Sequence, residues 1–268
     1  MIDLGKRNIL GVRVNALDYE AAVHRIIEAG KEKQPLGVSA LAVHGVMTGV
    51  LDPVHRYRLN HLELVLPDGQ PVRWALNILH KTRLPDRVCG PDTMLFVCQK
   101  AAQEGLPIYL YGSRPVVLEA LAKNLCAKFP GLIVAGSQPS KFRQTTPEEK
   151  LEVIQQIKDS GAAITFVGLG CPRQEVWAYE YTQALSMPVM AVGAAFDFHA
   201  GLLSKAPQIL SDLGLEWFYR LLAEPKRLWK RYLYLNPLYI WMFLLQWLNI
   251  RKYDPAEATR PDQDMRYG

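Results

Sequence analysis

The segment with the clearest chemical potential is residues 162–177, which predicts a buried strand, a glycine loop and the start of a helix. Its first six residues are apolar or β-branched, as in a strand covered on both faces. Gly168 and Gly170 allow tight turning and close approach by a ligand. A helix N-terminus offers unpaired N–H groups and a positive dipole end, which can bind a phosphate. Arg173 and Gln174 lie beside that end and suit phosphate oxygens or sugar hydroxyls.

This loop alone does not fix a ligand. The same residues fit a strand-to-helix turn in which the glycines serve only packing. The dinucleotide fingerprint has a third glycine that is missing here, which disfavours an NAD site. No Gly-Lys-Ser/Thr sequence follows, which excludes a Walker-type NTPase loop.

Glycine or acidic residues follow four of the predicted strands. We expect strands over residues 9–14, 37–43, 108–111, 131–135, 162–167 and 187–192. Helical patterns alternate with them, which predicts an α/β fold: a Rossmann-like, mostly parallel sheet with helices on both faces. Ligands bind beyond the carboxyl ends of the strands in such sheets. We therefore expect Gly112, Gly136, Gly168 and Asp197 to lie at a ligand site.

The composition is that of a large globular domain with an extension. The chain has 268 residues, 49% of them apolar and 21% charged, and a formal net charge of +5. We expect an α/β core over residues 1–208, a helical appendage over 209–253 and a disordered polar tail over 254–268. The N-terminus lacks the basic start and apolar core of a signal peptide. Four scattered cysteines without metal-type pairs indicate a reducing cytoplasm: Cys89, Cys98, Cys126 and Cys171.

The appendage joins a basic run to an uncharged aromatic stretch. Residues 226–231 carry four cations and no acid, and residues 232–250 carry no charge. That length reaches the lower range for a membrane span. Pro237, several amides and many Trp and Tyr residues favour instead a helix lying on an anionic membrane surface. A helix packed on the core or on another subunit is the alternative, so a homo-oligomer stays open. Cations beside such an aromatic stretch disfavour a nucleic-acid partner.

Further motifs occur in a fixed order along the chain. They are LPDG at 66–69, RVCGPD at 87–92, YLYG at 109–112, VGLGCPRQEVW at 167–177, VGAAFDFHAG at 192–201, KAP at 205–207, LEWFYR at 215–220 and EPKR at 224–227. Together, over about residues 9–232, this set resembles the WecG/TagA/CpsF glycosyltransferases.

The resemblance implies an inverting enzyme on the cytoplasmic face of the plasma membrane. Such enzymes move N-acetylmannosamine or another hexose from a UDP-sugar to a polyprenyl-diphosphate-linked acceptor. They build teichoic acid and other cell-surface polysaccharides. The resemblance also implies that no metal ion is needed, because arginines and helix N-termini can stabilise the departing diphosphate.

The motifs also imply roles for single residues. Asp68 matches the family's proposed catalytic carboxylate, Gln174 matches a position that faces the nucleotide-sugar, and Asp197 lies by the same pocket. Three basic residues of the appendage match positions that close over the diphosphate: Arg220, Arg227 and Arg231.

One position departs from the family pattern. Where the family usually shows Thr-x-Asn, residues 42–44 read Ala-Val-His. An unperturbed imidazole, with a pKa of about 6.5, could also accept the acceptor's proton. Asp68 and His44 therefore both stay candidates for the base. Simpler roles also stay open, since Asp68 suits a turn and Asp197 a helix cap.

Two other functions compete with this interpretation. A dinucleotide-dependent oxidoreductase would explain the glycine loop, but the incomplete fingerprint disfavours it. A non-catalytic membrane adaptor with the same fold would explain the appendage. The presence of Asp68, Gln174 and Asp197 favours an enzyme over an adaptor.

Overall fold

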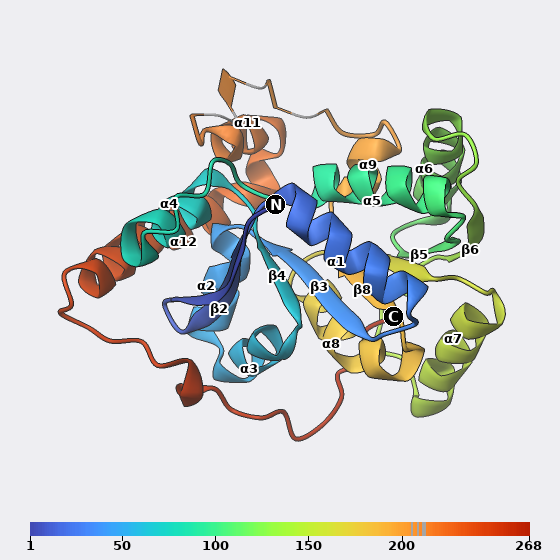
Figure 1. Ribbon diagram of the computed structural model, residues 1–268. Coiled ribbons are helices and arrows are strands. Elements are labelled where there is room, and N and C mark those ends of the chain that lie inside the picture. Colours follow the sequence, from blue (N-terminus) through green and yellow to red (C-terminus); the bar gives the residue numbers. More distant parts are fainter. Residues whose placement is uncertain (205, 208, 211–212) are drawn as a thin grey trace.

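A six-stranded parallel sheet forms the centre of the molecule (Figure 1). The structure is a computed structural model that describes residues 1–204, 206–207, 209–210 and 213–268, with residues 227, 230 and 231 described for their backbone alone. The strand order is β4-β3-β8-β7-β5-β6, and every pairing in this sheet is parallel. The predicted α/β class with a Rossmann-like parallel sheet is therefore confirmed.

The strands and helices follow one another along the chain as predicted for this class. The strands of the sheet are β3 (Leu36–Leu41), β4 (Leu64–Pro67), β5 (Ile108–Gly112), β6 (Val134–Gln138), β7 (Ile164–Gly168) and β8 (Pro188–Ala191). The helices around it are α1 (Tyr19–Lys31), α2 (Val43–Leu51), α3 (Pro53–His61), α4 (Gln70–His80), α5 (Gly90–Glu104), α6 (Pro115–Lys128), α7 (Pro147–Asp159), α8 (Arg173–Leu185) and α9 (Ala195–His199).

Alternate strand residues pack into two helix layers. Tyr109 and Val167 point into a buried cluster with α2, α3, α4, α7 and α8. Leu110 and Phe166, which are adjacent to these residues in the same strands, point into the opposite cluster with α1, α5, α6 and α9. This two-residue period buries both faces of the sheet and places the loops at its two ends.

The single strand expected over residues 9–14 is wrong. The chain forms a hairpin there, in which β1 (Asp3–Ile9) pairs antiparallel with β2 (Val12–Leu17). Leu10 and Gly11 make the two-residue turn, with φ values of 55° and 88°. Two-residue hairpin turns usually contain Asn-Gly or Asp-Gly, so the dipeptide Leu10-Gly11 did not predict a hairpin.

Helix α3 has a cap signal but no helical apolar pattern, and it was not predicted. The Asp52 carboxylate accepts hydrogen bonds from the N–H groups of Val54 and His55 at 2.8 and 3.1 Å. Pro53 occupies the first turn, where its missing N–H costs nothing.

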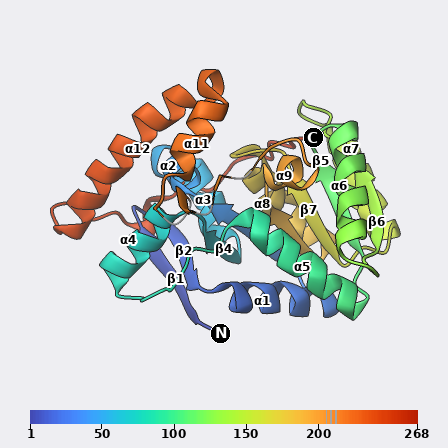
Figure 2. The ribbon, with the colours of Figure 1, turned by 90° about the horizontal axis from the view of Figure 1, so that it is seen from above.

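The appendage consists of α11 (Glu216–Ala223) and α12 (Pro225–Trp247), which lie beside α2 and α4 (Figure 2). Pro237 was expected to interrupt or start a helix, but it lies inside α12. One side of α12 joins the core cluster through Leu235, Leu238, Tyr239, Met242 and Phe243. Among the described residues, no helix has the length and apolar content needed to cross a bilayer.

The opposite side of α12 is rich in exposed apolar residues. Leu233, Tyr234 and Trp241 are each more than 60% exposed. Exposed apolar residues gathered on one side of a helix are typical of an interaction surface.

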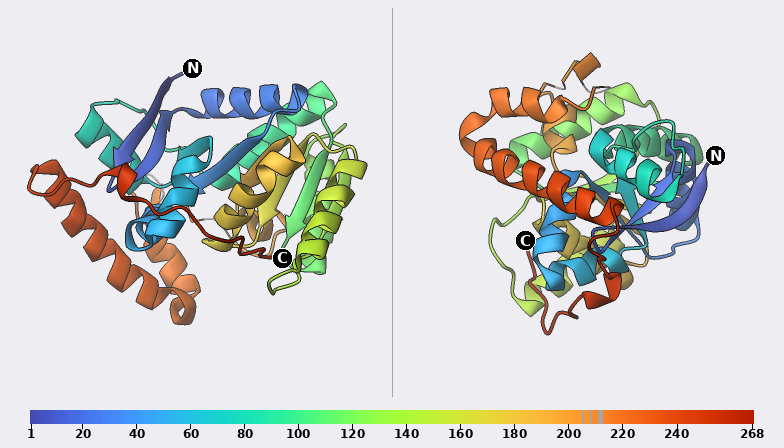
Figure 3. Two further views of the ribbon diagram at one scale, coloured as in Figure 1. Left: turned by 90° about the horizontal axis from the view of Figure 1, so that it is seen from below. Right: turned by 90° about the vertical axis from the view of Figure 1, so that its left-hand side faces the viewer.

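The disordered tail expected over residues 254–268 is not what the structure shows. After a 3-10 turn at Pro255–Glu257, the tail runs back across the molecule toward α7 (Figure 3). The Glu180 carboxylate accepts hydrogen bonds from the N–H groups of Met265 and Arg266 at 2.7 and 2.9 Å. Gln144 also pairs with Tyr267 in a short antiparallel bridge. Backbone and carboxylate partners therefore hold a segment whose polar composition suggested disorder.

Candidate active site

A cavity of about 760 Å³ opens beyond the carboxyl ends of β3, β4, β5, β7 and β8. This is the edge of the sheet at which a ligand was expected, and the volume is that of a small-molecule site. Helix α11 supplies part of the wall through Glu216 and Arg220. The cavity therefore lies between the core and the appendage.

Asp68 enters the cavity directly after β4. Burial, with a smaller contribution from the Glu216 carboxylate, raises the pKa of Asp68 to about 6. The opposing influences are the positive charges of Arg87 and Arg220 and a hydrogen bond from the Gly90 N–H. A carboxylate with this pKa is mostly ionised at neutral pH. Because its pKa lies close to neutral pH, the carboxylate can also accept a proton efficiently.

Two arginines link the cavity to the appendage. Arg87 Nη1 lies 2.6 Å from Glu216 Oε2, in an ion pair that joins the core loop to α11. The Arg220 guanidinium lies 5.7 Å from the centre of the Phe198 ring, which joins α11 to α9. Both arginines line the same cavity as Asp68. Docking of α11 thus completes the charged part of the site.

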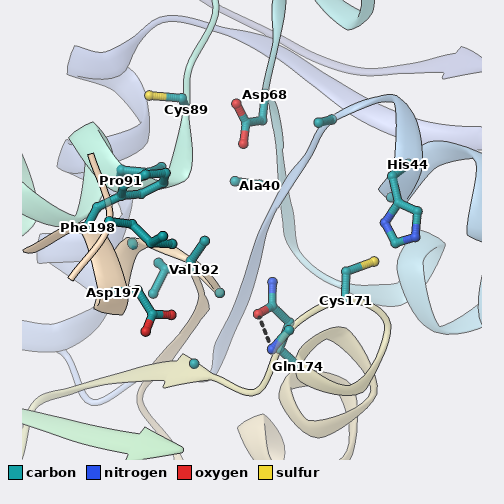
Figure 4. Close-up of a pocket in the computed structure, with 18 of the residues that line it drawn as sticks. Ala40, His44, Asp68, Cys89, Pro91, Cys171, Gln174, Val192, Asp197 and Phe198 are labelled. Carbon is teal, nitrogen blue, oxygen red and sulfur yellow. Dashed lines mark hydrogen bonds between the residues drawn. The ribbon is translucent and has the colours of Figure 1, made fainter. Parts of the chain in front are cut away.

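Gln174 is held by a buried network at the floor of the cavity. Its Oε1 accepts a hydrogen bond from the Gly170 N–H at 3.1 Å, and its Nε2 donates to Glu175 Oε1 at 2.9 Å. Ser39 Oγ donates to the same Glu175 oxygen at 3.2 Å. Burial raises the pKa of Glu175. Glu175 therefore fixes the orientation of the Gln174 amide, which faces Asp68 across the cavity (Figure 4).

His44 lies in the first turn of α2 and lines the cavity on a different side from Asp68. Figure 4 shows its ring beside Cys171, whereas Asp68 lies nearer Cys89. Both candidate bases thus reach the cavity, from the ends of β3 and β4 respectively.

Asp197 lines the cavity from the short helix α9. His199 Nε2 lies 2.9 Å from the Pro91 carbonyl oxygen, and Asn124 Nδ2 donates to the His199 carbonyl oxygen at 2.9 Å. These contacts hold α9 against α5 and α6. Gly168 also serves this packing, because a Cβ there would lie 2.5 Å from the Phe196 ring.

The structure brings together most of the predicted site residues. Those that line the cavity are His44, Asp68, Gly168, Gly170, Arg173, Gln174, Asp197 and Arg220. Gly112 lies at the end of β5, where a Cβ would meet the Gly168 carbonyl oxygen at 2.8 Å. The side chains of Arg227 and Arg231 lie outside the described part of the chain.

The expected place of Gly136 at the ligand site is wrong. Strand β6 continues to Gln138, so Gly136 lies within the strand, where it pairs with Tyr109. A Cβ at this position would lie 2.6 Å from Cε2 of the Tyr109 ring. The glycine therefore makes room for a core tyrosine, and it does not line the cavity.

Arg114, Glu175 and Glu216 are among the cavity residues that were missed or left without a role. Arg114, after the Gly112-Ser113 strand end, lines the rim, and the position of that loop could have indicated it. Glu175 carried a signal too, since a carboxylate beside Gln174 in the first helical turn can face inward. Glu216 carried none, because its partner Arg87 is distant in the sequence.

A second, apolar groove of about 520 Å³ joins the cavity at Asp68 and continues between α4 and α12. His44, Asp68, Arg87, Glu216 and Arg220 line both spaces. The two spaces therefore meet at the candidate base.

Fold and site together define an α/β protein with a ligand cavity at the carboxyl edge of a parallel sheet, closed on one side by a helical appendage. Residues 7–253 match the model of the glycosyl transferase WecG/TagA/CpsF family. The chain therefore belongs to this family and is a glycosyltransferase, with a sugar donor and an acceptor as substrates.

Proposed function

We propose that the protein transfers N-acetylmannosamine or another hexose from a UDP-sugar to a sugar on a polyprenyl diphosphate, with inversion at the anomeric carbon. The observation that carries this proposal is the position of Asp68, whose pKa is raised to about 6, where the polar cavity and the apolar groove meet. An enzyme that joins a water-soluble donor to a lipid-linked acceptor needs such a meeting point.

The proposed reaction is a single displacement. The acceptor hydroxyl attacks the anomeric carbon of the donor sugar while the bond from that carbon to the diphosphate oxygen breaks. UDP leaves with the electron pair, and Asp68 accepts the proton of the hydroxyl. His44 is the alternative acceptor of this proton, since it lines the same cavity.

The donor's diphosphate suits the arginine-bearing side of the cavity. Arg114 and Arg173 lie at the starts of α6 and α8, where helix N-termini favour an anion. The guanidinium groups of Arg114 and Arg173, which line the cavity and not the groove, can stabilise charge on the departing diphosphate. This arrangement supports transfer without a metal ion. Carboxylates such as Asp197 suit the hydroxyls of the sugar.

We also propose that the protein works at the cytoplasmic face of the plasma membrane. The exposed apolar residues of α12 and the cations at its start support attachment to an anionic lipid surface. A homo-oligomer that covers the same face is the competing arrangement. Sedimentation with and without anionic vesicles distinguishes the two.

A donor screen tests the proposed function. The full-length protein is incubated with single UDP-hexoses and a prenyl-diphosphate-linked N-acetylhexosamine, with and without EDTA. We expect UDP release and a product heavier by one sugar for one UDP-sugar, unchanged by EDTA. Absence of product for every donor, with UDP failing to raise the melting temperature, would contradict the proposal. A rise in the melting temperature with NAD instead of UDP would support an oxidoreductase.

A further inference from the structure

The described charged residues of the apolar groove between α4 and α12 all lie at one end of it. Its charged lining residues are Asp68, Arg87, Glu216 and Arg220, and all four also line the polar cavity. Away from that end, none of the described residues that line the walls is charged. A ligand that fits this groove therefore combines a polar head, which lies among two carboxylates and two arginines, with a long apolar remainder.

Helices from the core and the appendage build the apolar walls. Trp74, Ala75 and Ile78 come from α4, and Ile240 and Phe243 come from α12. The Tyr239 hydroxyl donates to the Pro71 carbonyl oxygen at 3.1 Å and fastens the two helices together. The walls of the groove are therefore held in place by the packing of these two helices.

The groove is open along its length. Trp74, Ile78 and Ile240 are 43%, 47% and 57% exposed. Exposed apolar walls of a groove are typical of a site that a ligand or a partner covers. The open side also lets a chain enter laterally, without threading through the polar cavity.

We propose that this groove binds the hydrocarbon chain of the acceptor's lipid carrier, with the diphosphate near Arg87 and Arg220 and the acceptor sugar at Asp68. The assignment rests on the proposed function for the identity of the acceptor. It adds the place where the chain lies and the residues that recognise it. The continuity of the groove with the cavity and the charges at the shared end favour this occupant over a second copy of the chain.

A binding experiment tests the groove without depending on transfer. Farnesyl diphosphate and methyl diphosphate, both below micelle-forming concentration and without detergent, are titrated against the full-length protein. Burial of each CH2 group is worth about a fourfold gain in affinity, so we expect farnesyl diphosphate to bind at least about tenfold more tightly. Equal affinities for the two diphosphates would overturn the proposal.

Matched variants locate the chain. The groove variant carries Ile78→Asn and Ile240→Asn, and the control variant carries Leu233→Asn and Trp241→Asn. The control residues are also highly exposed and apolar but do not line the groove. UDP binding and the melting temperature check that both variants are folded.

The groove variant should lose most of the preference for farnesyl diphosphate, and the control should keep it. Equal loss in both variants would overturn the proposal in favour of the exposed outer side of α12. A protein that dimerises, with the dimer broken by the groove variant and no farnesyl preference, would assign the groove to a second copy. If the farnesyl preference follows the groove but no UDP-sugar is used, the groove assignment stands and the proposed donor is wrong.

Discussion

The polar cavity and the apolar groove are built by different parts of the molecule. Loops at strand ends form most of the cavity, so its side chains are held by the sheet and by short helices such as α9. Two helices form the groove, one from the core and one from the appendage. Rigid strand ends suit a reaction that needs precise placement of a carboxylate, whereas an open helical groove suits a chain recognised only by its apolar surface. Asp68 belongs to both regions, whereas the other residues changed below, Glu216 and His44 excepted, belong to one region or to neither.

Removal of the Asp68 carboxylate should have the largest effect. We expect Asp68→Asn to lower the transfer rate about 100- to 10,000-fold, because a general base contributes about 10²–10⁴-fold. UDP affinity should change little. Asp262→Asn, at an exposed tail position, is the control. Unimpaired turnover by Asp68→Asn would contradict the role of this residue.

At alkaline pH, Asp68→Asn should have a larger free energy of unfolding than the unaltered protein. The pKa of Asp68 is raised to about 6 from an ordinary value of 3.8, so the favourable protonated form is lost as pH rises through 6. At pH 8 the ionised, partly buried carboxylate lowers stability, and Asp68→Asn should raise it by about 1–2 kcal/mol. The gain should shrink toward pH 4 when unfolding is measured in urea at both pH values.

A smaller effect is expected at the floor of the cavity. Glu175→Gln replaces the oxygen that accepts from Gln174 and Ser39 with a group that can present an amide N–H instead. One lost buried hydrogen bond is worth about 1 kcal/mol, so we expect the donor KM to rise roughly fivefold with a lesser change in kcat. Exposed Glu152→Gln is the control. An increased KM for the lipid acceptor alone would contradict this role, because Glu175 would then act on the acceptor groove and not on the donor cavity.

The ion pair between core and appendage should tune the base. Glu216→Gln removes a negative charge that raises the pKa of Asp68 and also frees Arg87, which lowers that pKa. Both changes have the same sign, so the pH midpoint of transfer should fall by less than about one unit. Glu257→Gln serves as the exposed control. A midpoint that rises or stays fixed would show that α11 does not act on Asp68.

The C-terminal tail should contribute more to the stability of the fold than to the function of the polar cavity or the apolar groove. Glu180→Gln weakens the hold on the N–H groups of Met265 and Arg266 and should cost about 1–2 kcal/mol of folding free energy. Thermal unfolding measures this loss. Transfer should change less than about threefold, since none of the described tail residues lines the cavity and the tail reaches it through Phe142, whose N–H donates to the Gly268 carbonyl oxygen. A large loss of transfer without loss of stability would give the tail a direct role in the site.

Much of the cavity could be predicted because its residues follow strands with strong local patterns. The glycine loop at 168–170 and the acid after β4 lie where a parallel sheet must place them. The features that were missed depend on contacts between distant segments. The Arg87–Glu216 pair links residues 129 positions apart. The tail is held by partners that are distant in the sequence, on α7, on α8 and in the loop near Thr145. Gly136 was misplaced because the glycine was taken as the end of the strand, whereas β6 runs two residues beyond it to Gln138, which Pro139 follows.

The pH dependence of kcat/KM for transfer tests the central claim most directly, since it reports the ionisation of the free enzyme's base. If Asp68 accepts the proton, kcat/KM should rise about tenfold per pH unit below 6 and level off above it. His44→Ala should leave this midpoint in place. A profile that is flat down to pH 4.5, or a midpoint that disappears in His44→Ala, would contradict the account.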